Sequence, residues 1–381
     1  MKKLIILLLI LLCSCTSQKS YFSLADEGNI ANVKSQYSGT CWVTAASTSI
    51  ESSYKMKYNQ DIEIDPSKIA DDIYDDNKEE GYFLKKGTDK YDFGGWSWMI
   101  IEAAANGIED YILTEGYGIK EFSRDEIKDV IENFGAVTID INDYSYRFGT
   151  FDGKKTLNAL ENDFIDHAVV LIGWDDNFPK ENFKKPASQN GAWLAQNSKG
   201  PSWGNDGRYW ISYDTPLESP TIFSVSKDYE HVEYYDGAKF SSIQTGDKTT
   251  VYNKFHYEGL LKAVGTYTTK PNQKLDISIY DDNDNLLTNL STTEKLEGYH
   301  LIQLKEPINV KDYRIQITYD GQAPVEGESW QDGVLSFVAS IDKDVSYVKI
   351  DDKWYDLSSP NTIAKLHIDF MPNNCSIKAI Y

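Results

Sequence analysis

The sequence predicts an α+β protein, in which a first domain with a helical half and a β half is followed by an all-β sandwich domain. The 381 residues suit two domains better than one. Helix signals crowd the first hundred or so residues after an N-terminal leader, whereas only strand-like runs separated by turn clusters follow residue 230. We therefore expect a leader over residues 1–14, a first domain over 15–228 and a second over 229–381.

Residues that typically begin or end helices predict the helices of the first domain. Asp65 followed by Pro66 is an N-cap before a first-turn proline, and Ser123 with Glu126 three residues later is a capping box. A third helical stretch ends at the Asn-Gly pair of residues 106–107, a good C-terminal stop. These signals predict helices that begin at about residues 66 and 124.

Short apolar or aromatic runs bounded by Gly, Asn and Asp are typical of strands. In the β half of the first domain, such runs cover residues 136–141, 167–174, 192–195 and 208–213. Beyond residue 230 we expect no helix longer than a turn. The runs that predict an antiparallel sandwich there cover residues 275–280, 299–304, 313–319 and 334–341.

The chain is acidic, with 38 Lys and Arg against 59 Asp and Glu and a formal net charge of -21. Neither nucleic acid nor an anionic membrane surface is attracted to such a field, so we expect no nucleic-acid partner. The acidic turn of residues 281–285 offers oxygen ligands at alternate positions to calcium, but a hairpin turn explains the same residues. We expect neither a metal nor a cofactor.

The N-terminus is typical of a secretory signal. Lys2 and Lys3 precede an apolar run from Leu4 to Leu12 that is too short to span a bilayer as a permanent helix. The Leu12-Cys13-Ser14-Cys15 that follows resembles the bacterial lipobox, in which a small residue precedes a cysteine that is acylated and becomes residue one. We expect Cys15 to anchor an exported lipoprotein in a membrane, facing the periplasm or the cell exterior. The alternative is cleavage by an ordinary signal peptidase and free secretion.

Two cysteines then remain, Cys41 and Cys375, which is too few for a disulfide scaffold, and a bridge between them is the alternative to free thiols. Cys41 ends a polar, glycine-containing loop and begins a predicted helix whose Ala46, Ile50 and Tyr54 share one face. A helix N-terminus favours a thiolate and offers free N–H groups to a developing oxyanion. The position of Cys41 therefore suits a nucleophile.

Two further segments complete a chemical pattern with Cys41. His167 begins an apolar strand-like run, and Asn197 ends another. A thiolate nucleophile needs an imidazole to form an ion pair and shuttle the proton, and the imidazole needs a partner that fixes its tautomer. Each residue alone suits a structural role, as a buried cysteine, a core histidine or a turn asparagine. Together they indicate a nucleophile, a base and an orienting residue.

Short motifs surround these three residues. They are Cys41-Trp42 with the Val-Lys-x-Gln before it, Gly94-Gly95-Trp96, Gly135-Ala136-Val137, Asn197-Ser198, and Trp203-Gly204-Asn205-Asp206-Gly207. Through them the first domain resembles the papain family of cysteine peptidases, and the β region after residue 230 is similar to the lectin-like domain behind a subset of bacterial members. The resemblance implies a papain-like two-lobed domain that hydrolyses protein or peptide substrates through an acyl-enzyme, and a C-terminal domain that contacts a glycan or the cell wall.

The resemblance also implies roles for single residues. The expected catalytic residues are Cys41 as nucleophile, His167 as base, Asn197 as orienting residue and Gln36 as oxyanion-hole donor. The expected substrate-binding residues are Gly94, Gly95, Trp203 and Asp140. Asp140 falls where members usually have a small residue in the pocket for the second side chain before the cleaved bond, and a carboxylate there favours Lys or Arg. A one-residue slip in register would turn it to solvent instead.

Three departures from the family pattern are visible. Gln36 lies five residues before Cys41, where the family usually has six. Lys199 replaces a tryptophan that shields the Asn–His bond, so we expect water to reach that bond unless Trp203 covers it. An insertion from about Asn177 to Asn190 precedes the asparagine, as in the bacterial subset. Only 25 residues separate the expected anchor from the nucleophile, so we expect no control by a helical propeptide.

Two other functions fit parts of the pattern. One is a catalytically impaired papain-like protein that binds peptides or glycans at the cell surface. The other is a cell-wall amidase of the Cys-His kind, against which the Asn-Ser and Trp-Gly spacing argues. A cysteine peptidase accounts for all of the motifs, and it is the function that the sequence favours.

Overall fold

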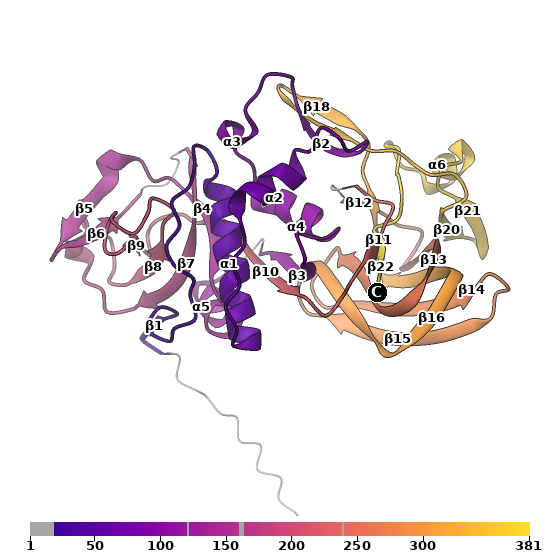
Figure 1. Ribbon diagram of the computed structural model, residues 1–381, viewed down its shortest axis with the longest axis horizontal. Coiled ribbons are helices and arrows are strands. Elements are labelled where there is room, and N and C mark those ends of the chain that lie inside the picture. The colour runs from indigo at the N-terminus through magenta and orange to yellow at the C-terminus, as the bar shows by residue number, and fades with distance from the viewer. Residues whose placement is uncertain (1–18, 120–121, 160–163, 238–239) are drawn as a thin grey trace, which may run out of the picture.

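The computed structural model describes residues 19–119, 122–159, 164–237 and 240–381 (Figure 1). The predicted leader and the expected anchor Cys15 lie outside the described residues. Within the described part of the chain, no helix is long and apolar enough to cross a membrane.

The helices of the first domain begin where the sequence signals them. They are α1 (Cys41–Tyr58), α2 (Pro66–Ile73), α3 (Lys90–Phe93), α4 (Ser97–Ala104) and α5 (Arg124–Asn133). The Asp65 side chain accepts a hydrogen bond from the Ser67 N–H at the start of α2, and Ser123 and Glu126 make both bonds of a capping box at α5. The predicted helix starts at residues 66 and 124 are therefore confirmed.

The strands of the first domain include all four predicted runs. They are β1 (Tyr21–Ser23), β2 (Gly81–Leu84), β3 (Ile112–Gly118), β4 (Val137–Ile141), β5 (Phe148–Phe151), β6 (Lys154–Leu157), β7 (His167–Asp175), β8 (Ala192–Gln196), β9 (Arg208–Ser212) and β10 (Glu218–Ser226). Strand β7 pairs antiparallel with β1, β4 and β8 and is buried along nearly its whole length. Its apolar sequence suits a strand that is covered on both faces.

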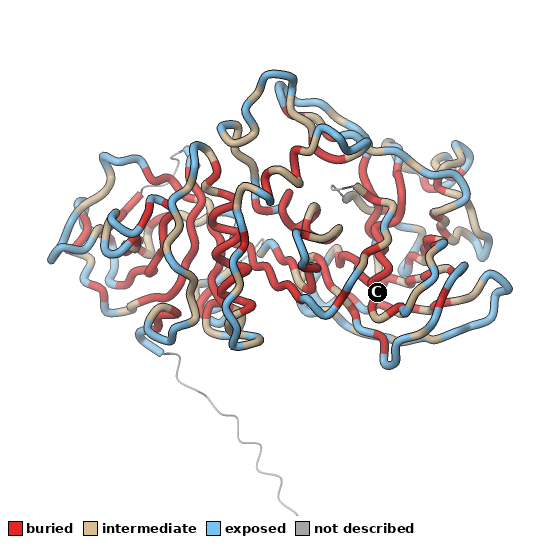
Figure 2. The backbone as a smooth tube through the Cα atoms, in the orientation of Figure 1, coloured by how far each residue is buried: buried red, intermediate tan, exposed pale blue. Residues whose placement is uncertain are grey.

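Helix α1 is enclosed by the rest of the domain, with every residue from Trp42 to Tyr54 buried (Figure 2). Its small polar side chains bind the surrounding backbone instead of water. The Ser49 hydroxyl donates to the carbonyl of Ala136 at 2.6 Å, and that of Ser53 donates to the carbonyl of Phe223 at 2.6 Å. Such bonds compensate the burial of polar groups and fix the helix against the strands on either side.

The second domain is almost entirely β. Its strands are β11 (Val232–Glu233), β12 (Phe240–Ile243), β13 (Lys248–Thr268), β14 (Gln273–Asp281), β15 (Leu286–Glu294), β16 (Gly298–Asp320), β17 (Ala323–Glu326), β18 (Trp330–Asp332), β19 (Leu335–Val338), β20 (Ser346–Ile350), β21 (Lys353–Asp356) and β22 (Ile377–Ile380). In β14 and in the second half of β16, buried and half-buried residues alternate, which places one face of each strand in the core.

Two details of the second domain differ from the sequence prediction. The runs at 299–304 and 313–319 belong to one long strand, β16, which pairs with β13 through two irregularities in register. The expectation of no helix longer than a turn is wrong, because α6 (Pro360–Leu366) spans seven residues. Ser359 before Pro360 is an ordinary helix start signal in the sequence, whereas the helix ends at His367 in a left-handed conformation that the residue type does not announce.

Strand pairing joins the two domains. Strand β2 of the first domain pairs with β19 of the second, and together with β18 they form the arm at the top of Figure 1. Strand β3 also pairs with β16, and the Asn106 amide donates to the carbonyl of Asp236 at 3.3 Å. The side of the helical half that faces the second domain is thus held in a fixed position relative to that domain.

Candidate active site

Cys41 is the first residue of α1 and is half-buried. The hydroxyl of Thr40, the N-cap residue, donates to the carbonyl of Tyr37 at 2.6 Å and makes no capping bond to the helix. The N–H groups of the first turn are therefore left without a side-chain cap, next to the thiol. This arrangement supplies donors for an anion at the helix N-terminus.

The loop before Cys41 is shaped by close backbone contacts. The Gly39 N–H donates to the carbonyl of Tyr91 at 2.8 Å, and a Cβ at position 39 would lie 2.7 Å from the carbonyl oxygen of Asp92. Ser38 has a left-handed φ of 48°. A tight turn at Ser38 and Gly39 therefore leads the chain into Cys41.

His167 begins β7, and Asn197 follows the end of β8, the neighbouring strand. The His167 Nε2 lies 2.9 Å from Oδ1 of Asn197, which also accepts from the Ser198 N–H at 2.8 Å. Since an amide oxygen only accepts, Nε2 carries the proton and Nδ1 is the nitrogen left for the thiol. His167 interacts with the Cys41 side chain, so the structure brings all three predicted catalytic residues together.

The surroundings of His167 favour its charged form. Burial would lower the pKa of His167, but the hydrogen bond with Cys41, the charge of Asp143 and the bond to Asn197 outweigh burial and raise the pKa above its ordinary value. His167 is 8% exposed and Asn197 is 3% exposed. The expectation that Lys199 lets water reach their bond is therefore wrong.

Gln36 lies between the nucleophile loop and the asparagine segment. Its Oε1 accepts from the Ser198 hydroxyl, and its Nε2 donates to the carbonyl of Ser38 at 2.6 Å. The Gln36 N–H also donates to the Ser198 carbonyl at 2.7 Å, which ties the two segments together. One of the two N–H bonds of the Gln36 side-chain amide is thus engaged in the loop.

The glycine pair packs against α1. A Cβ at Gly95 would lie 2.6 Å from the ring of Trp42, so only glycine allows this close approach. The carbonyl of Gly94 accepts from the Tyr74 hydroxyl at 2.8 Å. The first domain therefore places residues 94 and 95 beside the helix that begins at Cys41.

Asp140 lies on β4, where its register partners are Ala168 of β7 and Glu218 of β10. The next residue of β4, Ile141, is opposite His167, so Asp140 and His167 are neighbours in the backbone while their side chains leave the sheet on opposite faces. Burial raises the pKa of Asp140 to about 6, with Glu218 contributing and a hydrogen bond from Ser219 opposing. The Asp140 carboxylate is thus half-buried and shares its face with Ala168.

Sequence reasoning missed Asp143. Its Oδ2 lies 3.6 Å from Nε2 of His167 and 2.5 Å from Nζ of Lys199. The ring of Trp203 lies beneath that ammonium group, 5.4 Å from Nζ to the ring centroid. The available signal was that residue 143 follows the predicted strand 136–141, since the neighbouring antiparallel strand begins at His167. The registers were needed to see that the two ends meet.

Both remaining cysteines are free, so the alternative of a bridge between them is not realised. Cys375 is fully buried in the second domain, and burial raises the pKa of its thiol far above the ordinary range. Cys41 is the half-buried one, beside an imidazole. The two thiols therefore differ sharply in accessibility.

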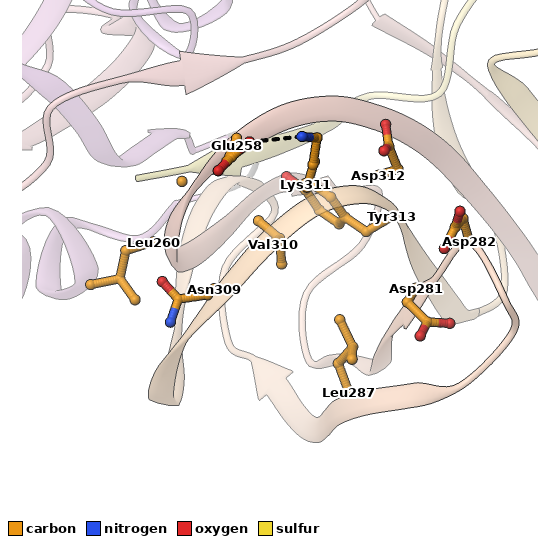
Figure 3. A pocket seen from close by; sticks show the side chains of 11 residues that line it. Glu258, Leu260, Asp281, Asp282, Leu287, Asn309, Val310, Lys311, Asp312 and Tyr313 are labelled. Carbon is orange, nitrogen blue, oxygen red and sulfur yellow. Dashed lines mark ion pairs between the residues drawn. The ribbon is translucent and has the colours of Figure 1, made fainter.

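The second domain carries a hollow of about 660 Å³ with carboxylates and apolar side chains on its wall (Figure 3). Glu258 and Lys311 form an ion pair of 2.9 Å at its rim. Asp281 contributes to the wall, but its carboxylate accepts from the N–H groups of Asn283 and Asn285, as in a hairpin turn between β14 and β15. Among the described residues, no group of three or more His, Cys, Asp or Glu could hold a metal ion.

Comparison with known proteins separates the two domains clearly. Residues 102–220 match the profile of the papain family of cysteine proteases, and residues 234–380 match that of the lectin-like domain. One part of the chain is therefore similar to papain-family cysteine proteases, and a later part is similar to lectin-like domains.

Solved structures of similar proteins confirm the fold. The clostridial cysteine protease Cwp84 after propeptide cleavage superposes with a TM-score of 0.77 at 20% identity, over 95% of this chain and 99% of that one. A structure of the cysteine protease and lectin-like domains of Cwp84, a surface layer associated protein of Clostridium difficile, superposes with a TM-score of 0.75 at 20% identity, over 96% and 88% of the two chains. The predicted α+β fold, a papain-like domain followed by a β domain, is thus confirmed.

Curated relatives resemble parts of the papain-like chain. Serine-repeat antigen protein 5 of Plasmodium falciparum is 26% identical over 165 residues, which cover 37% of this chain and 16% of the relative. Falcipain-2a of the same organism is 25% identical over 188 residues, which cover 46% and 38%. The chain spans less than half the length of either relative.

Proposed function

We propose that this chain is an exported, lipid-anchored cysteine endopeptidase that hydrolyses peptide bonds through Cys41, His167 and Asn197. One observation carries the proposal: a half-buried thiol at an uncapped helix N-terminus interacts with an imidazole whose far nitrogen bonds Asn197 at 2.9 Å. The match to the papain family supports the same chemistry. These are the three parts that nucleophilic catalysis by cysteine requires.

The proposed reaction has two halves. The Cys41 thiolate attacks the carbonyl carbon of the scissile bond, and the oxyanion receives N–H donors from the start of α1 and from Gln36. His167 then gives its proton to the leaving amine, and an acyl-enzyme forms. In the second half His167 takes a proton from water, the hydroxide attacks the thioester, and Cys41 leaves as a thiolate. Asn197 holds the imidazole in the required tautomer throughout.

The same proposal places substrate around the thiol. The backbone of Gly94 and Gly95 would pair with an extended substrate, since no side chain obstructs it there. Trp203 lies beyond Asn197 and would border the other end of the cleft. Asp140 would close the pocket for the second side chain before the cleaved bond, beside Glu218 on β10. Two neighbouring carboxylates favour a cationic substrate side chain.

The first test concerns the nucleophile and its base. Cys41→Ala should abolish peptide hydrolysis, with kcat/KM falling by about four orders of magnitude or more, because no other group can form the acyl-enzyme. His167→Ala should match it, and Asn197→Ala should cost less because the amide orients without reacting. Steady-state kinetics on a fluorogenic peptide, with circular dichroism to check the fold, measure this. Retained activity in the Cys41 variant would refute the proposal.

The second test concerns Asp140. With matched substrates that differ only at the second residue before the cut, the wild type should prefer Lys or Arg over Leu by about tenfold or more at pH 7.5, since a charge pair at close range supplies over 1.4 kcal/mol even in a partly aqueous site. Asp140→Asn should lose most of that preference. In the wild type the preference should also weaken below about pH 6, where the carboxylate takes up its proton. Equal kcat/KM for Lys and Leu in the wild type would rule out this pocket.

The proposed location rests on the leader and on the surface-layer association of Cwp84. By the same likeness, the lectin-like domain would contact a glycan or the cell wall, and the hollow of Figure 3 offers polar and apolar groups for that contact. Acylation of Cys15 would hold the enzyme in the membrane by burying methylene groups, which salt does not weaken.

The third test follows from the anchor. After expression in a bacterial host that processes lipoproteins, the wild type should stay with the membrane fraction through a high-salt wash, whereas Cys15→Ser should be released. Cys41→Ser is the matched control, because it changes a cysteine that the anchor does not use. If the Cys15 variant remains in the washed membranes, the anchor is elsewhere.

A further inference from the structure

We propose that Asp143, held in place by Lys199, is a second positioning residue for His167, beside Asn197. The inference rests on the proposed function and adds a charged group to its neutral orienting amide. It arises from the departure at position 199, where the ammonium of Lys199 forms an ion pair of 2.5 Å with the carboxylate of Asp143.

The geometry places two acceptors at one nitrogen. Asn197 Oδ1 lies 2.9 Å from Nε2 of His167, and Asp143 Oδ2 lies 3.6 Å from the same atom. Both acceptors therefore lie on the Nε2 side of the ring, and Nδ1 is the nitrogen on the side of Cys41. When the imidazole takes up its second proton, the resulting charge faces a full negative charge as well as an amide dipole.

Asp143 is held on two sides. Its N–H donates to Oδ1 of Asp166 at 3.0 Å, and its side chain, 10% exposed, accepts from the Lys199 ammonium. A carboxylate with fixed backbone and side-chain partners cannot turn away from the ring without breaking the ion pair. Its position relative to His167 is thus part of the fold.

The ammonium group of Lys199 lies against two aromatic rings. Its Nζ lies 5.4 Å from the ring centroid of Trp203 and 5.8 Å from that of Phe148, and these two rings contact each other at 5.4 Å. Cation–π contact suits an ammonium group above such rings. The two rings therefore help to hold the lysine ammonium beside the Asp143 carboxylate.

Several ionisable groups face His167 and set its charge. Cys41 approaches from α1, Asp140 from β4 and Asp143 from the segment after β4, while the Lys199 ammonium partly offsets the last of these. The phenol of Tyr209 on β9 also lies near Asp143 and is buried. Asp143 is the carboxylate closest to Nε2 on the Asn197 side. It should therefore keep the imidazolium, and with it the thiolate ion pair, intact to higher pH.

The test uses alkylation of the folded mature protein by iodoacetate, an anion whose attack on Cys41 is favoured by the neighbouring imidazolium. The rate should fall at alkaline pH as His167 loses its proton. In Asp143→Asn the pH at which the alkylation rate falls should be lower by about one unit, as expected when a charge about 4 Å away is removed. In Lys199→Met it should move up, because the Asp143 N–H stays bonded to Asp166 and the positive charge that offsets the Asp143 carboxylate is gone. Asp152→Asn, an exposed change of the same charge in the β5–β6 turn, should leave it unchanged.

The outcomes are distinguishable. A folded Asp143→Asn protein with the alkaline fall of the wild type would overturn the inference. If that variant does not fold, Lys199→Met decides the matter, and the absence of an upward shift would overturn it equally. If wild-type Cys41 reacts no faster than a free thiol at neutral pH, the proposed function itself fails. A role in stability alone would lower the yield of the variant without moving the pH of the fall.

Discussion

The enclosure of α1 is the constraint on which the site depends. A helix buried from Trp42 to Tyr54 cannot slide or tilt without breaking the hydrogen bonds that Ser49 and Ser53 make to the strands beside it. Its N-terminus, the one end that keeps unpaired N–H groups, is therefore fixed relative to β7. Cys41 lies at that end, so the position of the thiol follows from the packing of the whole domain.

The second half of the site depends on sheet register. Strands β4, β7 and β8 are neighbours, and their registers bring the end of β4, the start of β7 and the end of β8 to one edge. A one-residue slip would turn every side chain of a strand to the other face and separate His167 from Asn197. Burial alone would lower the pKa of His167, but the hydrogen bond with Cys41, the nearby carboxylate of Asp143 and the bond to Asn197 meet at this edge and raise it.

The helix starts, the strands and the grouping of Cys41, His167 and Asn197 could be predicted from the sequence, because capping residues, strand periodicity and short motifs act over a few positions. The Asp65 and Ser123 caps and the run from His167 are examples. Asp143 could not be found in this way, because its contact with His167 depends on pairing between strands that are distant in sequence. Nor could the continuity of β16, since the polar residues between its two apolar runs are typical of a turn. Helix α6 is different, because Ser359 and Pro360 form a local start signal that the sequence does contain.

The most direct test of the account is labelling of the native protein with an epoxysuccinyl peptide probe, followed by mass spectrometry of the digested chain. The account predicts one probe per molecule, on Cys41, with Cys375 labelled only after unfolding, because, of the two cysteines that the structure describes, only Cys41 combines an accessible thiol with an imidazole partner. Absence of label on native Cys41, or labelling of Cys375 at a similar rate, would contradict it.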